Sequence, residues 1–106
     1  SGPPVPLSSQ QAVGLSLALY ELATNAAKYG ALASPLGMVD LTWSVMGDDF
    51  ALDWQETGGQ VVAAPTREGF GSRLVNMIVP AYFNGEGQAE FLPQGLHYTL
   101  RGQLTP

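Results

Sequence analysis

Three side chains with complementary chemistry are spaced for one side of a helix: Glu21, Asn25 and Lys28. Positions i, i+4 and i+7 of an α-helix fall within an arc of about 60°. A carboxylate can act as a base, an amide oxygen is a hard ligand for Mg²⁺, and an ammonium group neutralises phosphate charge. The trio therefore suits a metal-bound phosphate, but a polar helix face also carries such residues for solvation alone.

A second candidate group runs from Asp53 to Gly59. It places a carboxylate at the end of an expected strand, followed by Gly58 and Gly59, which let the backbone approach a ligand closely. A carboxylate in such a pocket can accept a hydrogen bond from an exocyclic amine, such as that of adenine. An ordinary strand end followed by a glycine turn would have the same sequence pattern. We expect Trp54 in the core or the pocket wall.

A third group lies at Glu68–Leu74, where Gly69 and Gly71 flank Phe70 just before an expected helix. Backbone N–H groups at a helix start bind phosphate, assisted by the helix dipole. The segment is neither the lysine-containing phosphate loop nor the G-x-G-x-x-G fingerprint. A flexible loop without a ligand is the alternative reading.

His97 is the only histidine of the chain, and cysteine is absent. Without cysteine there is no disulfide framework and no thiolate metal site. A single histidine with no nearby nucleophile or ligand set supports neither a catalytic triad nor a zinc site. We expect His97 to be an ordinary strand residue.

The elements that would position these groups follow from periodicity and turn residues. The chain has 106 residues, of which 45% are hydrophobic, enough for a single domain with one core. The pattern predicts helix, two strands, a loop, helix and two strands. The expected ranges are a helix from Ser8 or Ser9 to about 29, strands 38–45 and 50–56, a helix from 71 or 72 that Pro80 ends, and strands 88–92 and 96–103.

Two turn signals decide the fold class. Gly47-Asp48-Asp49 and Pro93-Gln94-Gly95 each separate two expected strands, as in β-hairpins. Hairpins exclude a doubly wound parallel sheet. We therefore predict an α+β two-layer sandwich, with a mixed, largely antiparallel sheet and the helices on one face.

Charge and hydropathy exclude several function classes. The net charge is −5, which argues against a nucleic-acid surface. No apolar run approaches the roughly 18 residues that a bilayer requires, so we expect no membrane contact by this chain. Three of the four cations lie near the candidate phosphate groups: Lys28, Arg67 and Arg73. Because the chain begins with Ser1, we expect it to be a piece of a longer protein, and the absence of cysteine fits a cytoplasmic location.

Together, the three groups resemble the ATP-binding catalytic domain of sensor histidine kinases, which has the Bergerat ATPase fold. The similarity covers nearly the whole chain and is greatest to the HWE subfamily. Residues 20–32 resemble the box H-E-L-A-T-N-A-x-K-Y-G-A-L, residues 54–59 resemble W-x-E followed by glycines, and residues 69–74 match G-F-G-S-R-L.

The resemblance implies roles for the helix residues. Glu21 matches the acid that helps activate the attacking group, and Asn25 matches the magnesium ligand. Lys28 and Tyr29 match positions that contact phosphate and nucleotide. One departure is Tyr20, which replaces the subfamily's histidine and lies about 100° around the helix from Glu21.

The resemblance also implies roles for the two glycine-bearing groups. Glu56 stands where the family places its adenine-reading carboxylate, and Gly58 and Gly59 shape that pocket. The third box would form the hinge and phosphate end of a lid over the nucleotide. Its matching residues are Gly69, Phe70, Gly71 and Ser72.

These roles imply a domain that binds ATP and Mg²⁺ in two-component signal transduction. It would transfer the γ-phosphoryl group to a histidine on a separate phosphoacceptor and dimerisation domain, and a response regulator would be a further partner. His97 does not match that acceptor, so we expect the isolated chain to bind ATP without phosphorylating itself. One alternative is a serine kinase of the anti-sigma-factor type, against which the W-x-E box argues. Another is a degenerate docking domain for a response regulator, against which the intact boxes argue.

Overall fold

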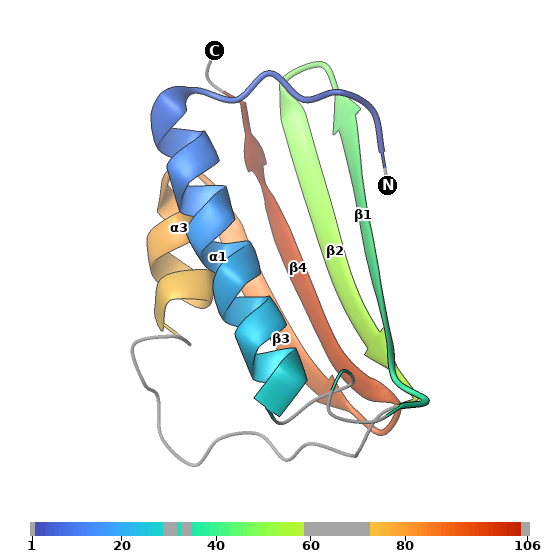
Figure 1. Ribbon diagram of the computed structural model, residues 1–106. Helices are drawn as coiled ribbons and strands as arrows, with labels where there is room; N and C mark the ends of the chain where they lie inside the picture. The colour runs from blue at the N-terminus through green and yellow to red at the C-terminus, as the bar shows by residue number, and fades with distance from the viewer. Residues whose placement is uncertain (1, 29–31, 33–34, 59–72, 105–106) are drawn as a thin grey trace.

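The computed structural model describes residues 2–28, 32, 35–58 and 73–104. Their four strands form one antiparallel sheet in the order β1-β2-β4-β3, and the helices lie on one of its faces (Figure 1). The predicted two-layer α+β architecture is confirmed, with every described strand pair antiparallel. The elements are α1 (Ser9–Lys28), β1 (Met38–Met46), β2 (Asp49–Thr57), η2 (Leu74–Ile78), α3 (Val79–Ala81), β3 (Glu86–Leu92) and β4 (Gly95–Gln103).

Helix α1 begins with a reciprocal capping box. The Gln11 N–H donates to Ser8 Oγ at 3.1 Å, and the Ser8 N–H donates to Gln11 Oε1 at 3.3 Å. Gln11 is only 1% exposed, and its Nε2 donates to the carbonyls of Tyr82 and Gln103, both at 3.0 Å. One side chain thus fixes the start of α1 against the ends of α3 and β4. Among the described residues, no helix is long and apolar enough to span a membrane.

The strands alternate as predicted. In β2, the residues from Phe50 to Glu56 alternate between buried and partly exposed, and β4 repeats this around Tyr98 and Leu100. The apolar members of the buried set pack against α1, η2 and α3 in one core. Its buried residues are Ala18, Leu22, Ala26, Phe50, Leu52, Trp54, Leu74, Val75, Val79, Phe83, Tyr98, Leu100 and Leu104.

Both predicted hairpins are present. The first turn pairs Met46 with Asp49 and has Gly47 at φ +63°, a conformation that favours glycine. The second turn pairs Leu92 with Gly95. The strands extend one or two residues beyond the predicted limits, because backbone pairing continues up to these turns and, at the far ends of β2 and β3, to Thr57 and Glu86.

The prediction that Pro80 ends the second helix is wrong. The π-helix η2 continues directly into α3, which contains Pro80. In η2 the Val79 N–H donates to the Leu74 carbonyl, so the next bond of this kind would join position 80 to the Val75 carbonyl. Proline has no N–H to donate. The Tyr98 hydroxyl of β4 donates to the Val75 carbonyl instead, so the helix continues without an orphaned acceptor there.

The Tyr98 contact is deeply buried. Tyr98 is 0% exposed, and burial raises the pKa of its phenol well above the ordinary value. Gly87 of β3 leaves the space for this contact, since a Cβ there would lie 2.6 Å from the Val75 carbonyl oxygen and 2.8 Å from Tyr98 Oη. The close approach of η2 to the sheet therefore depends on a residue without a side chain.

Candidate functional site

The predicted helix trio lies on the flank of α1 that faces η2 and α3. Gly14 marks this flank, because a Cβ there would lie 2.3 Å from the Tyr82 ring that follows α3. Glu21 and Asn25 come 7 and 11 residues after Gly14, about two and three turns further on the same side. Both are partly buried, and Lys28 at the end of the helix is exposed. The helix that the spacing assumed is present, so the three positions share one side of α1.

Glu56 is the carboxylate of β2 that faces the helices. It is 2% exposed, and its Oε2 accepts a hydrogen bond from Trp54 Nε1 at 2.9 Å. Strand alternation turns Asp53 to the opposite face of the sheet. Of the two carboxylates in the second group, Glu56 rather than Asp53 therefore lies on the face of the sheet that packs against the helices. Trp54 is 6% exposed, as expected for a core or pocket-wall residue.

Gly58 ends β2 in a conformation that requires glycine. Its φ is +73°, and a Cβ would lie 2.4 Å from the Leu36 carbonyl oxygen. The chain therefore turns sharply two residues after Glu56. The ends of β2 and α1 lie at the same end of the molecule (Figure 1), which brings the carboxylate and the trio to a common region. The other predicted contact residues are outside the described residues: Tyr29, Gly59, Gly69, Phe70, Gly71 and Ser72.

Curated relatives match the chain over its full length. It is 40% identical over 110 residues, 100% of this chain, to the blue-light-activated histidine kinase of Brucella ovis. It is 43% identical over 99% of its length to the protein of the same name from Brucella anthropi. The chain belongs to the histidine kinase family. It spans 22% of the length of each relative, and no family model matches it.

Solved structures share the fold of this histidine kinase domain. The histidine kinase domain of a blue-light-activated kinase from Erythrobacter litoralis aligns with a TM-score of 0.80 at 20% identity, covering 97% of this chain and 52% of that one. The catalytic domain of the histidine kinase ThkA aligns with a TM-score of 0.65 at 16% identity, covering 89% and 68%. The fold predicted from the resemblance is therefore confirmed.

The departure at Tyr20 lies outside the candidate site of the kinase domain. Tyr20 is 72% exposed, and it lies about 100° around α1 from Glu21. Its side chain extends into solvent rather than toward the trio.

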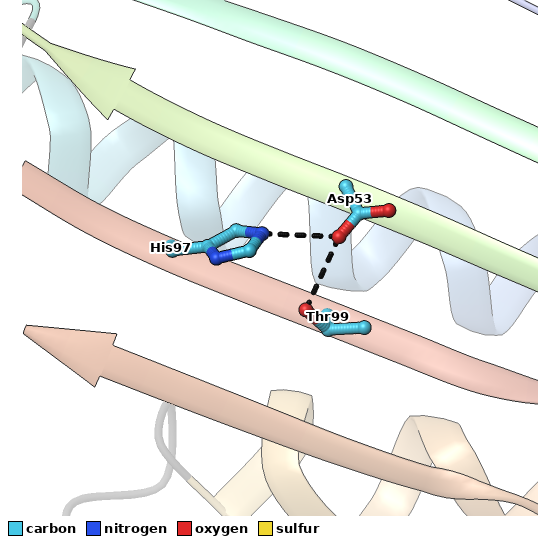
Figure 2. Close-up of polar contacts among 3 residues, drawn as sticks. All are labelled: Asp53, His97 and Thr99. Atoms are coloured by element: carbon cyan, nitrogen blue, oxygen red, sulfur yellow. Dashed lines mark hydrogen bonds and ion pairs between the residues drawn. The ribbon is translucent and has the colours of Figure 1, made fainter.

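The face of the sheet opposite the described helices, here called the bare face, carries a polar cluster that local spacing in the sequence does not predict. Asp53 Oδ1 lies 3.0 Å from His97 Nε2 and accepts a hydrogen bond from Thr99 Oγ1 at 3.2 Å (Figure 2). Alternation shows that His97 and Thr99 share a face, but only the β2–β4 register places Asp53 beside them. A groove of about 750 Å³ borders this cluster and β3, and its lining includes none of the predicted site residues.

The chemistry of this cluster is limited. His97 and Thr99 bond to the same carboxylate oxygen, which is not the nucleophile–base–acid series of a triad. The described residues contain no group of three His, Asp or Glu side chains that could hold a metal ion. The cluster is a cross-strand polar contact that supports the sheet, as expected for His97 as a strand residue.

Proposed function

We propose that this domain binds ATP with Mg²⁺ and transfers the γ-phosphoryl group to a histidine on another domain of its parent kinase. The observation that carries the proposal is the common placement of Glu21, Asn25 and buried Glu56. All three lie on the helix-covered side of the sheet: Asn25 and Glu56 lie within three residues of the ends of α1 and β2, and Glu21 lies about one turn earlier on α1. The box pattern further supports assignment to the HWE subfamily.

The buried end of the site would bind the adenine ring of ATP. Trp54 Nε1 holds one oxygen of the Glu56 carboxylate in place, which fixes the orientation of an acceptor for the adenine amine. A hydrogen bond from a neutral amine to a buried carboxylate is charge-assisted and hence stronger than a neutral pair. Gly58 turns the backbone immediately beyond it, and Gly59 and Tyr29 would contribute further contacts.

The helix end of the site would handle the phosphates. The Asn25 amide oxygen would bind Mg²⁺, and the ion would neutralise charge on the phosphates. Lys28 would add a counter-charge. The lid residues Gly69 to Ser72 would offer backbone N–H groups to the phosphate chain.

Glu21 would act as the base. The acceptor imidazole nitrogen attacks the γ-phosphorus, the bond to the β-phosphate oxygen breaks, and ADP leaves. Glu21 takes the imidazole proton. Phosphoryl transfer depends mainly on positioning and charge neutralisation, which a rigid helix can supply. The phosphohistidine would then supply a response regulator, in the cytoplasm where ATP is available.

Calorimetric titration of the domain with ATP and Mg²⁺ tests the proposal. We expect a binding isotherm that Asn25→Ala abolishes and Gln88→Ala leaves within twofold, since Gln88 is exposed on β3, away from the site. Circular dichroism and thermal melts confirm that both variants are folded. Absence of ATP binding by the folded, unmodified domain would refute the proposal.

A further inference from the structure

The outward face of α1 carries an exposed apolar stripe. Val13, Leu17 and Tyr20 are 61%, 48% and 72% exposed. Their spacing of i, i+4 and i+7 places them in one line along the helix, the arrangement of anchor residues in helix-mediated recognition. The stripe ends one residue before Glu21.

The composition of this face is that of an interface rather than a solvated surface. From Ser9 to Tyr20 the helix contains no charged residue. A helix face exposed to water usually carries Lys, Glu or Arg. Lysine and glutamate are depleted at protein interfaces, and aromatic residues such as tyrosine are enriched there. Three turns of uncharged helix with three large exposed side chains therefore indicate a surface that another element covers.

The shape of the stripe indicates what covers it. Val13 and Leu17 form a ridge of i and i+4 residues, and Ala12 and Ser16 form a lower row beside it. Among the described residues, these four line a shallow groove of about 340 Å³. A ridge beside a groove at this spacing is the surface into which a second helix packs, at a crossing angle of about 50°.

The size of the stripe indicates how that helix is held. Three side chains can bury only a few hundred Å², well below the roughly 800 Å² per partner of a stable interface between separate proteins. A helix of the same polypeptide needs no such area, because the linkage keeps its effective concentration high. The curated relatives are long enough to supply one, since this chain spans 22% of their length.

We propose that Val13, Leu17 and Tyr20 form a docking surface for an apolar helix of the parent kinase that lies outside the present chain. This inference rests on the proposed function. Tyr20 adjoins Glu21 in sequence, so a helix seated on the stripe lies within about one helical turn of the proposed base. The docked helix positions the phosphoryl acceptor relative to Glu21 without touching the adenine pocket.

The test uses the parent kinase with Val13→Gln and Leu17→Gln combined. Glutamine favours helix and adds no charge near Glu21. Met46→Gln is the matched control, because Met46 is 82% exposed and lies at the β1–β2 turn. We expect autophosphorylation to fall about tenfold or more in the double variant, with ATP affinity within twofold of the parent. The control should retain both properties.

Hydroxyl-radical labelling of the same proteins reports on the surface itself. In the parent kinase Tyr20 should be labelled several-fold more slowly than its 72% exposure in the domain predicts, and the double variant should restore fast labelling. Unchanged autophosphorylation and fast Tyr20 labelling in the parent, with ATP binding intact, would overturn the docking proposal alone. Loss of ATP binding in the unmodified parent would instead overturn the proposed function. A dimer of the domain that the double variant dissociates would identify a second copy as the occupant and overturn the proposal.

Discussion

The two faces of the sheet place their carboxylates in different environments. Glu56 and Asp53 lie three residues apart on β2 and face opposite ways. Glu56 is 2% exposed beneath the helices and is held by a buried indole N–H. The Asp53 side chain is 43% exposed and bonds to His97 and Thr99 on the face that none of the described helices covers (Figure 2).

This difference explains why one carboxylate is suited to recognition and the other is not. A buried acceptor interacts strongly, because water does not compete and the surroundings screen charge weakly. An exposed acceptor exchanges its partners with water, so its contacts contribute little net free energy. Substitutions on the helix-covered face should consequently affect function and stability more than equivalent substitutions on the bare face.

The largest effect is expected for Glu56. Glu56→Gln should weaken ATP binding about 100-fold, about 3 kcal/mol, because the proposed charge-assisted hydrogen bond to the adenine amine would be lost. Asp53→Asn is the matched control and should change the affinity less than twofold. Calorimetric titration with ATP and Mg²⁺ measures both values. Equal losses in the two variants would break the distinction between the faces.

Much of this distinction could be predicted from the sequence. The alternation from Phe50 to Glu56 already puts Glu56 with the core residues and Asp53 on the other side. The capping serine, the hairpin turns and the helix trio also follow from local spacing. Local spacing did not reveal the Asp53–His97 contact, because it depends on the pairing register of β2 with β4.

The error at Pro80 has a similar cause. Proline was expected to end the helix because it leaves a carbonyl without its N–H partner. The donor that reaches the Val75 carbonyl instead is the hydroxyl of Tyr98 on β4, 23 residues after Val75. A rule based on neighbouring residues cannot include a tertiary partner of this kind, so the helix was predicted too short.

Tyr98 provides the second test. Tyr98→Phe should lower the free energy of unfolding by about 2 kcal/mol, because the buried Val75 carbonyl loses its donor. Thr99→Val, the adjacent position on the bare face, should cost less than about 1 kcal/mol. Urea denaturation of the two variants compares the faces directly. A larger loss for Thr99→Val would contradict the comparison.

The same tyrosine gives the domain a predictable response to alkaline pH. Burial raises the pKa of Tyr98 in the folded state above its ordinary value of about 10. The contribution of Tyr98 to the free energy of unfolding is therefore complete below about pH 10. It is lost as the pH rises further, because the unfolded chain releases the phenol proton at a lower pH than the folded chain does. The free energy of unfolding should fall above pH 10, and less steeply in Tyr98→Phe.

Substitution of two glycines tests the turn that follows β2 beside Glu56. Gly58 and Gly47 both have positive φ, but a Cβ at Gly58 would lie 2.4 Å from the Leu36 carbonyl oxygen, whereas Gly47 has nothing within 4 Å. Both alanine variants should be destabilised by the backbone conformation, and Gly58→Ala should lose about 1.5 kcal/mol more. Thermal melts measure the difference, and similar losses would show that the Leu36 contact relaxes freely.

The smallest effect is expected for His97, where the bare face is at its most polar. Two carboxylates lie beside its position on the sheet: Asp53, bonded to it, and Glu90, directly opposite on β3. Despite these neighbours, His97→Gln should change the free energy of unfolding by less than about 1 kcal/mol at pH 7, since glutamine keeps a donor and exposed pairs contribute little. ATP affinity should not change. A large loss of ATP binding in this variant would mean that the two faces are coupled through β2, because Asp53 and Glu56 share that strand. The helix-covered face could then no longer be treated as an independent binding surface.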